Sequence, residues 1–331
     1  MKFPYGISDF HKLITEDYFY VDRTDRIPVI EEMGEQLLFL RPRRFGKSLW
    51  LSTLANYYDV ARAGEFERLF GHLAVGQNPT PRHNQYFVLR WDFSLVAAYG
   101  DANEIAQALH RHVNGRIQDF VTYYQQMLPG PIEIHPTDAL VSLQSVLTAI
   151  SQTPHKLYLL IDEYDNFANE LAMSGQPTGK ARYDALLRGE GALKTLFKAV
   201  KGATSGFGLD RVFITGVSPI VLSDLTSGYN SARNIYLQPA LNDLCGFTEV
   251  EIADALSQVA DACRFSASQT AEALEMMRTF YNGYRFCEEP APPVYNPTLA
   301  LYFMQEFQQN CRNPSHMLDS NLAMDRGKLA Y

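Results

Sequence analysis

Residues 37–48 read LLFLRPRRFGKS: four apolar residues lead into a basic loop that ends in Gly46-Lys47-Ser48. This order is typical of a strand, a phosphate-binding loop (P-loop) and the start of a helix. In such a loop, backbone N–H groups at the helix N-terminus converge on phosphate oxygens, the lysine bridges the β- and γ-phosphates, and the final hydroxyl ligates Mg²⁺. The stretch therefore predicts binding of ATP with Mg²⁺, with Ser48 as a metal ligand and Lys47 as a catalytic residue.

Arg41 stands where the P-loop pattern G-x-x-x-x-G-K-[ST] has its first glycine. Because Pro42 restricts the preceding residue to extended geometry, we expect the strand to continue through Arg41 and the loop to turn later. A left-handed non-glycine residue would cost roughly 1–2 kcal/mol, whereas a charge-assisted hydrogen bond contributes about 1.5–3 kcal/mol. The replacement of the first glycine is therefore expected to change the shape of the loop without abolishing phosphate binding. Its candidate nucleotide-binding residues are Arg43, Arg44, Phe45, Gly46, Lys47, Ser48 and Leu49.

A second motif closes the apolar run 157–161, which is followed by Asp162 and Glu163. A continuous apolar run suits a central parallel strand, and ligands bind at the carboxyl ends of such strands. Asp162 is predicted to hold Mg²⁺ through water, and Glu163 to act as general base on the attacking water. The alternative is a strand followed by a solvated acidic turn, which Asp165 and Glu170 would support. The P-loop upstream favours the metal site.

Three further polar residues lie at or just after the ends of predicted strands, and Arg233 lies further along the chain. Asp92 could help the Mg²⁺ shell or the water, or could be a turn or cap aspartate. Thr215 and Ser218 could sense the γ-phosphate or the water, or could be ordinary turn formers. Arg233 could serve as an arginine finger, although a surface arginine is the simpler interpretation.

Strand and helix patterns alternate through the first three quarters of the chain. The strand-like runs are 36–40, 86–91, 156–161 and 211–215, with a weaker fifth at 234–237. Helical periods occupy 48–58 and 102–124 and recur around Leu193 to Val200. Such alternation predicts an α/β fold, a mostly parallel sheet with helices on both faces.

After about residue 245, helix signals dominate. Thr248 and Glu251 form a capping box for a helix through residue 260. A second helix is expected at 271–281, and Asn296-Pro297 begins a third that runs to about 308. We therefore expect an α/β domain over 1–244 and a small helical lid or subdomain over 245–331.

The composition is that of an ordinary globular protein. The chain has 331 residues, 46% of them hydrophobic, and 37 acidic against 29 basic side chains give a net charge of −8. That balance argues against a large nucleic-acid surface. The absence of a signal sequence and of a long apolar run predicts a cytoplasmic protein with no membrane contact. The four cysteines are expected to be reduced, with a zinc site or a disulfide framework as the alternative.

The motifs together resemble the bacterial AAA-ATPase-like family, whose members often carry a C-terminal PD-(D/E)XK nuclease-type domain. The stretches that carry the resemblance are 5–10, 20–24, 41–48, 161–165, 215–218, 246–249, 281–284 and 295–297. The loop sequence RPRRFGKS, with arginine for the first glycine, is itself characteristic of the family. The resemblance covers most of the chain in the expected order.

This resemblance implies an ASCE-type P-loop NTPase fold and Mg²⁺-dependent ATP binding. It makes residues 5–7 and 20–24 candidates for the adenine and ribose side. A nuclease-type domain would begin near or beyond Tyr331, and nucleic acid would be a partner only through that domain. Residues 310–331 hold no acidic pair with a following lysine at nuclease spacing.

Three functional hypotheses remain open at this point. The first is a Mg²⁺-dependent ATPase that switches the helical lid or a missing effector domain, alone or as a homo-oligomer. The second is a nucleotide-binding scaffold that barely hydrolyses ATP. The third, a small-molecule kinase, is disfavoured because the sequence shows no signature of an acceptor pocket.

Overall fold

The computed structural model describes residues 1–318 except 167, 170–176, 188–190, 207, 220, 222–228 and 230. The chain forms two compact units. Unit 1 comprises residues 1–26, 43–52 and 236–331, and unit 2 comprises 27–42 and 53–235. The sequence predicted a single domain boundary, between residues 244 and 245. The two compact units of the structure instead each combine several separate segments of the chain.

Unit 2 is built on a five-stranded sheet with the order β2-β3-β4-β1-β5. The strands are β1 (Gln36–Leu40), β2 (Tyr86–Asp92), β3 (Lys156–Asp162), β4 (Leu209–Gly216) and β5 (Arg233–Asn234). Every pair is parallel. The carboxyl ends of the neighbouring strands β3, β4 and β1 therefore lie along one edge of the sheet, where α/β proteins bind ligands. The predicted α/β fold is confirmed.

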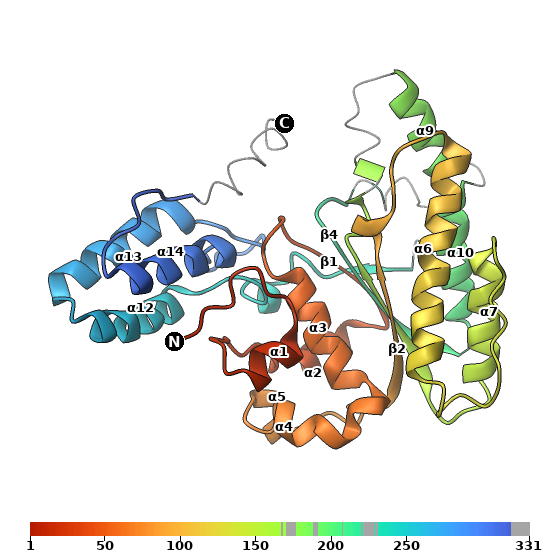
Figure 1. Cartoon of the computed structure of the whole chain (residues 1–331), viewed down its shortest axis with the longest axis horizontal. Coiled ribbons are helices and arrows are strands. Elements are labelled where there is room, and N and C mark those ends of the chain that lie inside the picture. The colour runs from red at the N-terminus through yellow and green to blue at the C-terminus, as the bar shows by residue number, and fades with distance from the viewer. Residues whose placement is uncertain are drawn as a thin grey trace. The chain divides into compact units, whose positions relative to one another are not determined.

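Helices cover the sheet of unit 2 (Figure 1). One face carries α6 (Ala102–Tyr123), α7 (Ala139–Ile150) and α10 (Ala192–Ala203). The apolar stripe predicted for the first of these is the buried stripe of α6, from Ile105 to Phe120, and a capping box of Asp101 and Glu104 begins the helix. The remaining elements of this unit are α2 (Arg26–Met33), the second half of α3 (Lys47–Tyr58), η1 (Val60–Glu65), α4 (Phe66–Phe70), α5 (Ala74–Gln77), η2 (Phe93–Leu95) and α9 (Pro177–Leu187).

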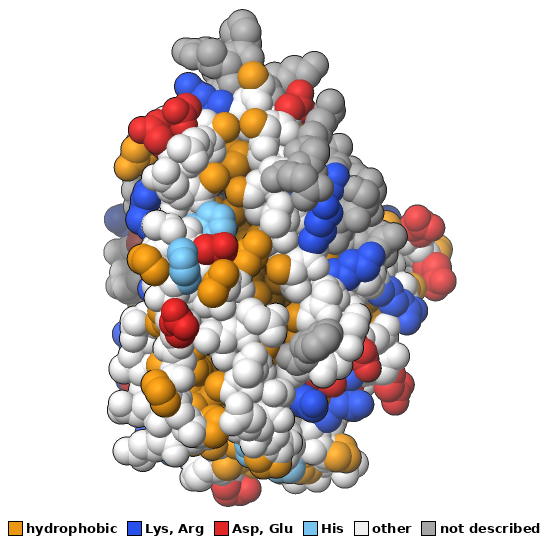
Figure 2. Space-filling view, turned by 90° about the vertical axis from the view of Figure 1, so that its right-hand side faces the viewer, with side chains coloured by type: hydrophobic (Ala, Val, Ile, Leu, Met, Phe, Trp, Pro, Cys, Tyr) orange, Lys and Arg blue, Asp and Glu red, His pale blue; other side chains and the backbone are white. Residues whose placement is uncertain are grey.

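The outer side of α6, α7 and α10 is mixed in character. Figure 2 looks onto this side and shows apolar side chains among polar ones, with lysines and arginines gathered toward one margin. Tyr123 on α6 and Val141 on α7 are among the exposed apolar residues. A cavity of about 580 Å³ is lined by residues 129–131 and one side of α7. Scattered apolar exposure of this kind is normal for a folded domain.

The edge strand differs from its prediction. The apolar signal lies at 234–237, but β5 pairs Arg233 and Asn234 with Leu37 and Leu38 of β1. Both β5 residues are exposed. Register with β1 determines this short pairing, and an exposed edge strand needs no apolar alternation, so the sequence pattern missed its start.

Unit 1 is helical in its C-terminal part (Figure 1). Its elements are α1 (Phe10–Thr15), η3 (Pro239–Leu241), α12 (Glu249–Cys263), α13 (Ala267–Tyr281) and α14 (Pro297–Asn310). The capping box of Thr248 and Glu251 and the Asn296 cap are confirmed. The second helix starts four residues earlier than expected, because Ser266 and Gln269 form a capping box. Apolar residues of all three helices form one core with Phe3 and Phe247.

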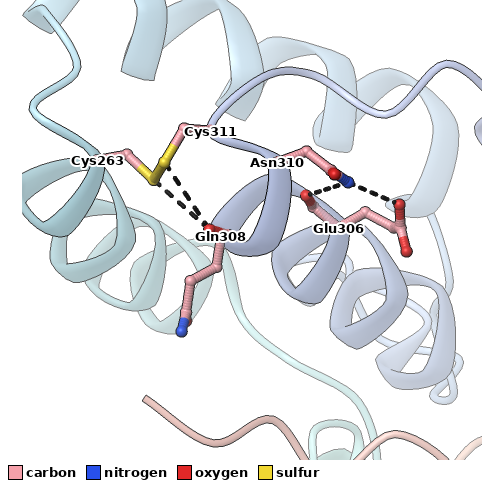
Figure 3. Close-up of a disulfide and its surroundings, with 5 residues drawn as sticks. All are labelled: Cys263, Glu306, Gln308, Asn310 and Cys311. Carbon is pink, nitrogen blue, oxygen red and sulfur yellow. Dashed lines mark hydrogen bonds between the residues drawn. A yellow bond between two sulfur atoms is a disulfide. The ribbon is translucent and has the colours of Figure 1, made fainter.

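A disulfide joins two of these helices (Figure 3). Cys263 is the last residue of α12, Cys311 is the C-cap of α14, and their Cα atoms lie 5.5 Å apart. The prediction of four reduced cysteines is therefore wrong for this pair, while Cys245 and Cys287 carry thiols. The physical reason is tertiary, since the packing of α12 on α14 brings their C-terminal ends together.

Reduction of this bond is expected to destabilise the protein. The bond closes a loop with a sequence separation of 48, and removing such a link increases the freedom of the unfolded chain, which costs about 2–4 kcal/mol of stability. Urea unfolding with and without dithiothreitol measures the effect. Cys287→Ser should respond to the reductant as the natural chain does, whereas Cys263→Ser should not respond. Equal responses of the two variants would contradict the disulfide.

None of the helices in the described residues combines the length and apolarity that crossing a bilayer requires.

Candidate functional site

The P-loop leaves the sheet of unit 2 at the carboxyl end of β1. The Arg41 N–H donates to the Gly216 carbonyl of β4 at 3.2 Å, so strand pairing continues one residue beyond β1. The Arg41 side chain is buried, its Nη1 donates to the Leu40 carbonyl at 2.8 Å, and its guanidinium carbon lies 4.3 Å from the Phe39 ring centre. The strand β1 itself ends at Leu40, and the expected continuation is present as this one backbone hydrogen bond of Arg41.

The loop turns later, in unit 1. Arg44 has φ +63° and Gly46 has φ +87°, so the left-handed positions fall after Arg41. The Gly46 carbonyl accepts the Trp50 N–H at 3.0 Å, which is the first bond of α3. Lys47, Ser48 and Leu49 thus occupy the first turn of α3, where backbone N–H groups point out of the helix end and suit an anion. The Lys47 side chain is almost fully buried.

The carboxyl ends of β3 and β4 meet in unit 2. Asp162 closes β3 and is 6% exposed, and the Thr215 hydroxyl of β4 donates to its Oδ1 at 2.5 Å. The Glu163 N–H donates to the same oxygen at 3.0 Å. The structure thus brings two of the predicted residues together. The Thr215 hydroxyl fixes the orientation of the Asp162 carboxylate.

Glu163 adopts an unusual backbone conformation. Its φ of +49° is left-handed, which costs a non-glycine residue roughly 1–2 kcal/mol. Non-glycine residues in this region often mark functional sites, because the strain persists only where the surroundings impose it. The Tyr164 N–H, which donates to the Thr215 carbonyl at 3.0 Å, holds the chain immediately after it.

Asp165, which the sequence analysis associated only with a possible solvated turn and with the family stretch 161–165, is a buried carboxylate that connects the segments after β3 and β4. Asp165 is fully buried and accepts the N–H groups of Val217 and Ser218 at 3.2 and 2.7 Å. The Tyr164 hydroxyl donates to the Ser218 carbonyl at 2.5 Å. The alternative of a solvated acidic turn is therefore wrong for Asp165, while Glu170 lies outside the described residues. A possible signal was the spacing of an aspartate three residues after Asp162.

Gly216 permits this close approach. A Cβ atom there would lie 2.5 Å from Asp165 Oδ1 and from the Tyr164 ring. Gly216→Ala is therefore expected to destabilise the fold by about 1–3 kcal/mol, as overpacking does elsewhere. The matched control is Gly202→Ala in α10, where a Cβ would meet nothing within 4 Å. Chemical denaturation measures both variants. Equal stability of the two would show that the edge can yield at no cost.

Two further predicted residues have hydrogen-bond partners outside the Asp162–Thr215 pair. The Asp92 Oδ1 accepts the Ser94 N–H and hydroxyl at 3.0 and 2.7 Å, which is the capping role that the sequence left open. Asp92 is also the register partner of Asp162 across β2 and β3. Arg233 is exposed, and its Nη1 donates to the Met33 carbonyl at 2.7 Å. Their catalytic roles remain predictions.

A family model described as predicted AAA-ATPase matches residues 4–226, more than half of the chain. The chain belongs to this predicted AAA-ATPase family. An uncharacterized protein in the vnfD 5′ region of Azotobacter chroococcum is 29% identical over an alignment of 322 residues that covers 93% of this chain and 53% of the relative. The chain thus spans about half the length of that relative.

Two solved structures are similar to this AAA-ATPase-like chain. A Walker-type ATPase of Pyrococcus abyssi is 17% identical with a TM-score of 0.50, over 94% of this chain and 71% of that one. The ORC2 protein of Aeropyrum pernix in its ADP form is 12% identical with a TM-score of 0.46, over 95% and 71%. At such identities the first likeness shows the fold alone.

The N-terminal stretches that the family resemblance placed near adenine and ribose lie in unit 1. The Arg23 guanidinium donates to both carboxylate oxygens of Glu251 at 2.5 and 2.7 Å and to the Asp243 carbonyl at 2.8 Å. Burial would raise the pKa of Glu251, but the hydrogen bonds and charge of Arg23 lower it. Arg23 therefore ties the N-terminal arm of this AAA-ATPase-like chain to α12.

Proposed function

We propose that the chain binds MgATP and hydrolyses it to ADP and phosphate. One observation carries this proposal: the P-loop starts at the sheet edge where Asp162 and Thr215 meet. Arg41, at the start of the loop, pairs with Gly216 of β4, and Thr215 of the same strand bonds Asp162 of β3. In P-loop enzymes, the residues that bind the triphosphate and the metal ion come from these two regions of the chain.

The residue roles follow from chemistry. Lys47, Arg43 and Arg44 supply positive charge for the phosphates, and the first turn of α3 supplies N–H groups, including that of Leu49. Phe45 and Gly46 contribute through the backbone. Glu163 is the base that takes a proton from the attacking water, and Thr215 keeps the Asp162 carboxylate oriented for the site.

The donor set fits Mg²⁺. The described residues contain no group of three or more His, Cys, Asp or Glu side chains that could cage a metal. Mg²⁺ usually binds through one or two protein oxygens together with water and phosphate. The Asp162 carboxylate and the Ser48 hydroxyl would supply those protein oxygens. When bound, the ion neutralises charge on the phosphates.

Ser218, Asp92 and Arg233 take secondary places in this proposal. Hydrogen bonds from Tyr164 and to Asp165 hold the Ser218 backbone, so the position of its side chain is well defined. It can sense the γ-phosphate or the water. Asp92 can support the water shell beside Asp162. Arg233, on the exposed edge strand, can act on a neighbouring copy if the protein forms a homo-oligomer.

We further propose that turnover switches a larger assembly. The relative of about twice this length leaves room for an effector domain beyond the region matched here. That domain would be of the nuclease type and would provide any contact with nucleic acid, and residues 245–331 would relay the change. Two measurements test the proposed effector domain separately from ATP hydrolysis. One compares the length of the full protein with that of the relative, and the other assays a chain of that length on DNA.

The direct test is phosphate release from the purified chain with ATP, with and without Mg²⁺ and with and without DNA. Magnesium-dependent release, together with ATP binding measured by calorimetry, is the expected result. Binding without release under every condition would instead favour a nucleotide-binding scaffold. Failure to bind ATP with Mg²⁺ present would overturn the proposed function.

A further inference from the structure

The middle of the P-loop is packed into the C-terminal part of unit 1. Phe45 is fully buried. Its ring centre lies 4.8 Å from that of Tyr284 and 5.2 Å from that of Phe286, both in edge-to-face geometry. Such geometry is the preferred packing of aromatic rings. The Phe45 side chain is therefore a wedge that fixes the loop against residues 284–286.

A hydrogen bond fixes the residue before the wedge. The Thr298 hydroxyl donates to the Arg44 carbonyl at 2.7 Å. Thr298 is the second residue of α14, whose start is set by Pro297 and by the Asn296 side chain, which accepts the Leu299 N–H at 3.2 Å. The donor thus belongs to a well-capped helix.

This bond has a consequence for phosphate binding. The Arg44 carbonyl and the Phe45 N–H belong to one planar trans peptide, so they point in opposite directions. With the carbonyl bound to Thr298, the Phe45 N–H is turned away from the start of α14. Arg44 also holds the left-handed φ of +63°, which a non-glycine residue adopts only under constraint. The Thr298 bond supplies such a constraint.

The aromatic partners of the wedge are tied to the helical core. Tyr284 and Val294 exchange backbone hydrogen bonds at 3.3 and 2.9 Å, and Tyr295 does the same with Phe247 at 2.8 and 3.3 Å. Phe247 and Tyr295 belong to the apolar core of α12, α13 and α14. A movement of the loop at Phe45 would therefore be passed to residues that are bonded to this core.

We propose that Thr298, Tyr284 and Phe286 are positioning residues that hold the P-loop in its phosphate-binding shape and transmit nucleotide occupancy to the helices α12–α14. The proposal rests on the proposed function and deepens it, because it names the elements that respond to the nucleotide. Thr298 sets the direction of the Phe45 N–H, and the two rings hold the loop through the Phe45 side chain.

Thr298→Val tests the hydrogen bond, because valine keeps the shape and removes the donor. ATP binding is expected to weaken about three- to tenfold, the value of one such bond. KM should rise by the same factor while kcat stays near its natural value, since the N–H contacts ground state and transition state alike. Thr298→Ser, which retains the hydroxyl, should restore binding.

The matched control is Thr270→Val in α13, where the hydroxyl donates within its own helix to the Ser266 carbonyl at 3.2 Å. A merely structural role of Thr298 would lower stability in both valine variants and leave the KM for ATP unchanged. If the wild-type chain binds ATP and Thr298→Val has the same KM as the wild-type chain, this inference is overturned and the proposed function is not. Absence of ATP binding in the wild-type chain would overturn the proposed function as well.

Hydrogen exchange tests the transmission. ATP is expected to slow exchange of backbone amides over 284–298 in the wild-type chain, and Phe286→Leu should reduce that protection. Phe280→Leu, at an exposed ring on α13, is the control and should leave the protection intact. Protection confined to residues 41–49, or equal protection in both variants, would refute transmission through the aromatic contacts.

Discussion

Glu163→Gln is expected to retain ATP binding and to lose phosphate release by about 10²–10⁴-fold, the usual contribution of a general base. Glutamine keeps the size and the hydrogen-bonding reach of the side chain but cannot take a proton from water. Glu163 follows Asp162 in a constrained left-handed conformation, so its position depends on the backbone, which the substitution leaves unchanged. Single-turnover phosphate release and calorimetric ATP binding together measure the two effects.

The control for this substitution is Glu67→Gln on the exposed side of α4, which should leave turnover unchanged. Hydrolysis by Glu163→Gln at a rate close to that of the wild-type chain would show that another group prepares the water. Asp92, the register partner of Asp162, would then be the next residue to replace.

Lys47→Ala is expected to lower kcat/KM for ATP by about 10²–10³-fold, because in the proposed site the lysine would stabilise phosphate charge that grows in the transition state. Lys47 is the first residue of α3, and the residue is 3% exposed. Loss of the charge should also weaken binding of a non-hydrolysable ATP analogue. Calorimetry with that analogue and steady-state kinetics measure the two losses.

Lys156→Ala, at the exposed first residue of β3, is the matched control and should change neither quantity. Because Lys47 is buried, denaturant unfolding of both variants is needed to show that Lys47→Ala remains folded. If Lys47→Ala is folded and binds the analogue as tightly as the wild-type chain, the P-loop lysine is not part of the nucleotide-binding site.

The local order of the sequence determined the framework of this protein. The apolar runs before Arg41 and Asp162 are strands, and the period of α6 appears as its buried stripe, because burial of one face sets these patterns residue by residue. Capping residues such as Thr248 and Asn296 fixed helix starts for the same reason, since their bonds reach only three residues along the chain.

The tertiary structure decided what depends on distant partners. Thr215 meets Asp162 across 53 residues, Thr298 meets Arg44 across 254, and Cys263 meets Cys311 across 48. No local pattern records such pairings, because strand register and helix packing select them only when the chain folds. The burial of Asp165 has the same origin, since its partners Val217 and Ser218 come directly after β4, the next strand of the sheet. The sequence therefore supplied the chemical groups, and folding arranged them.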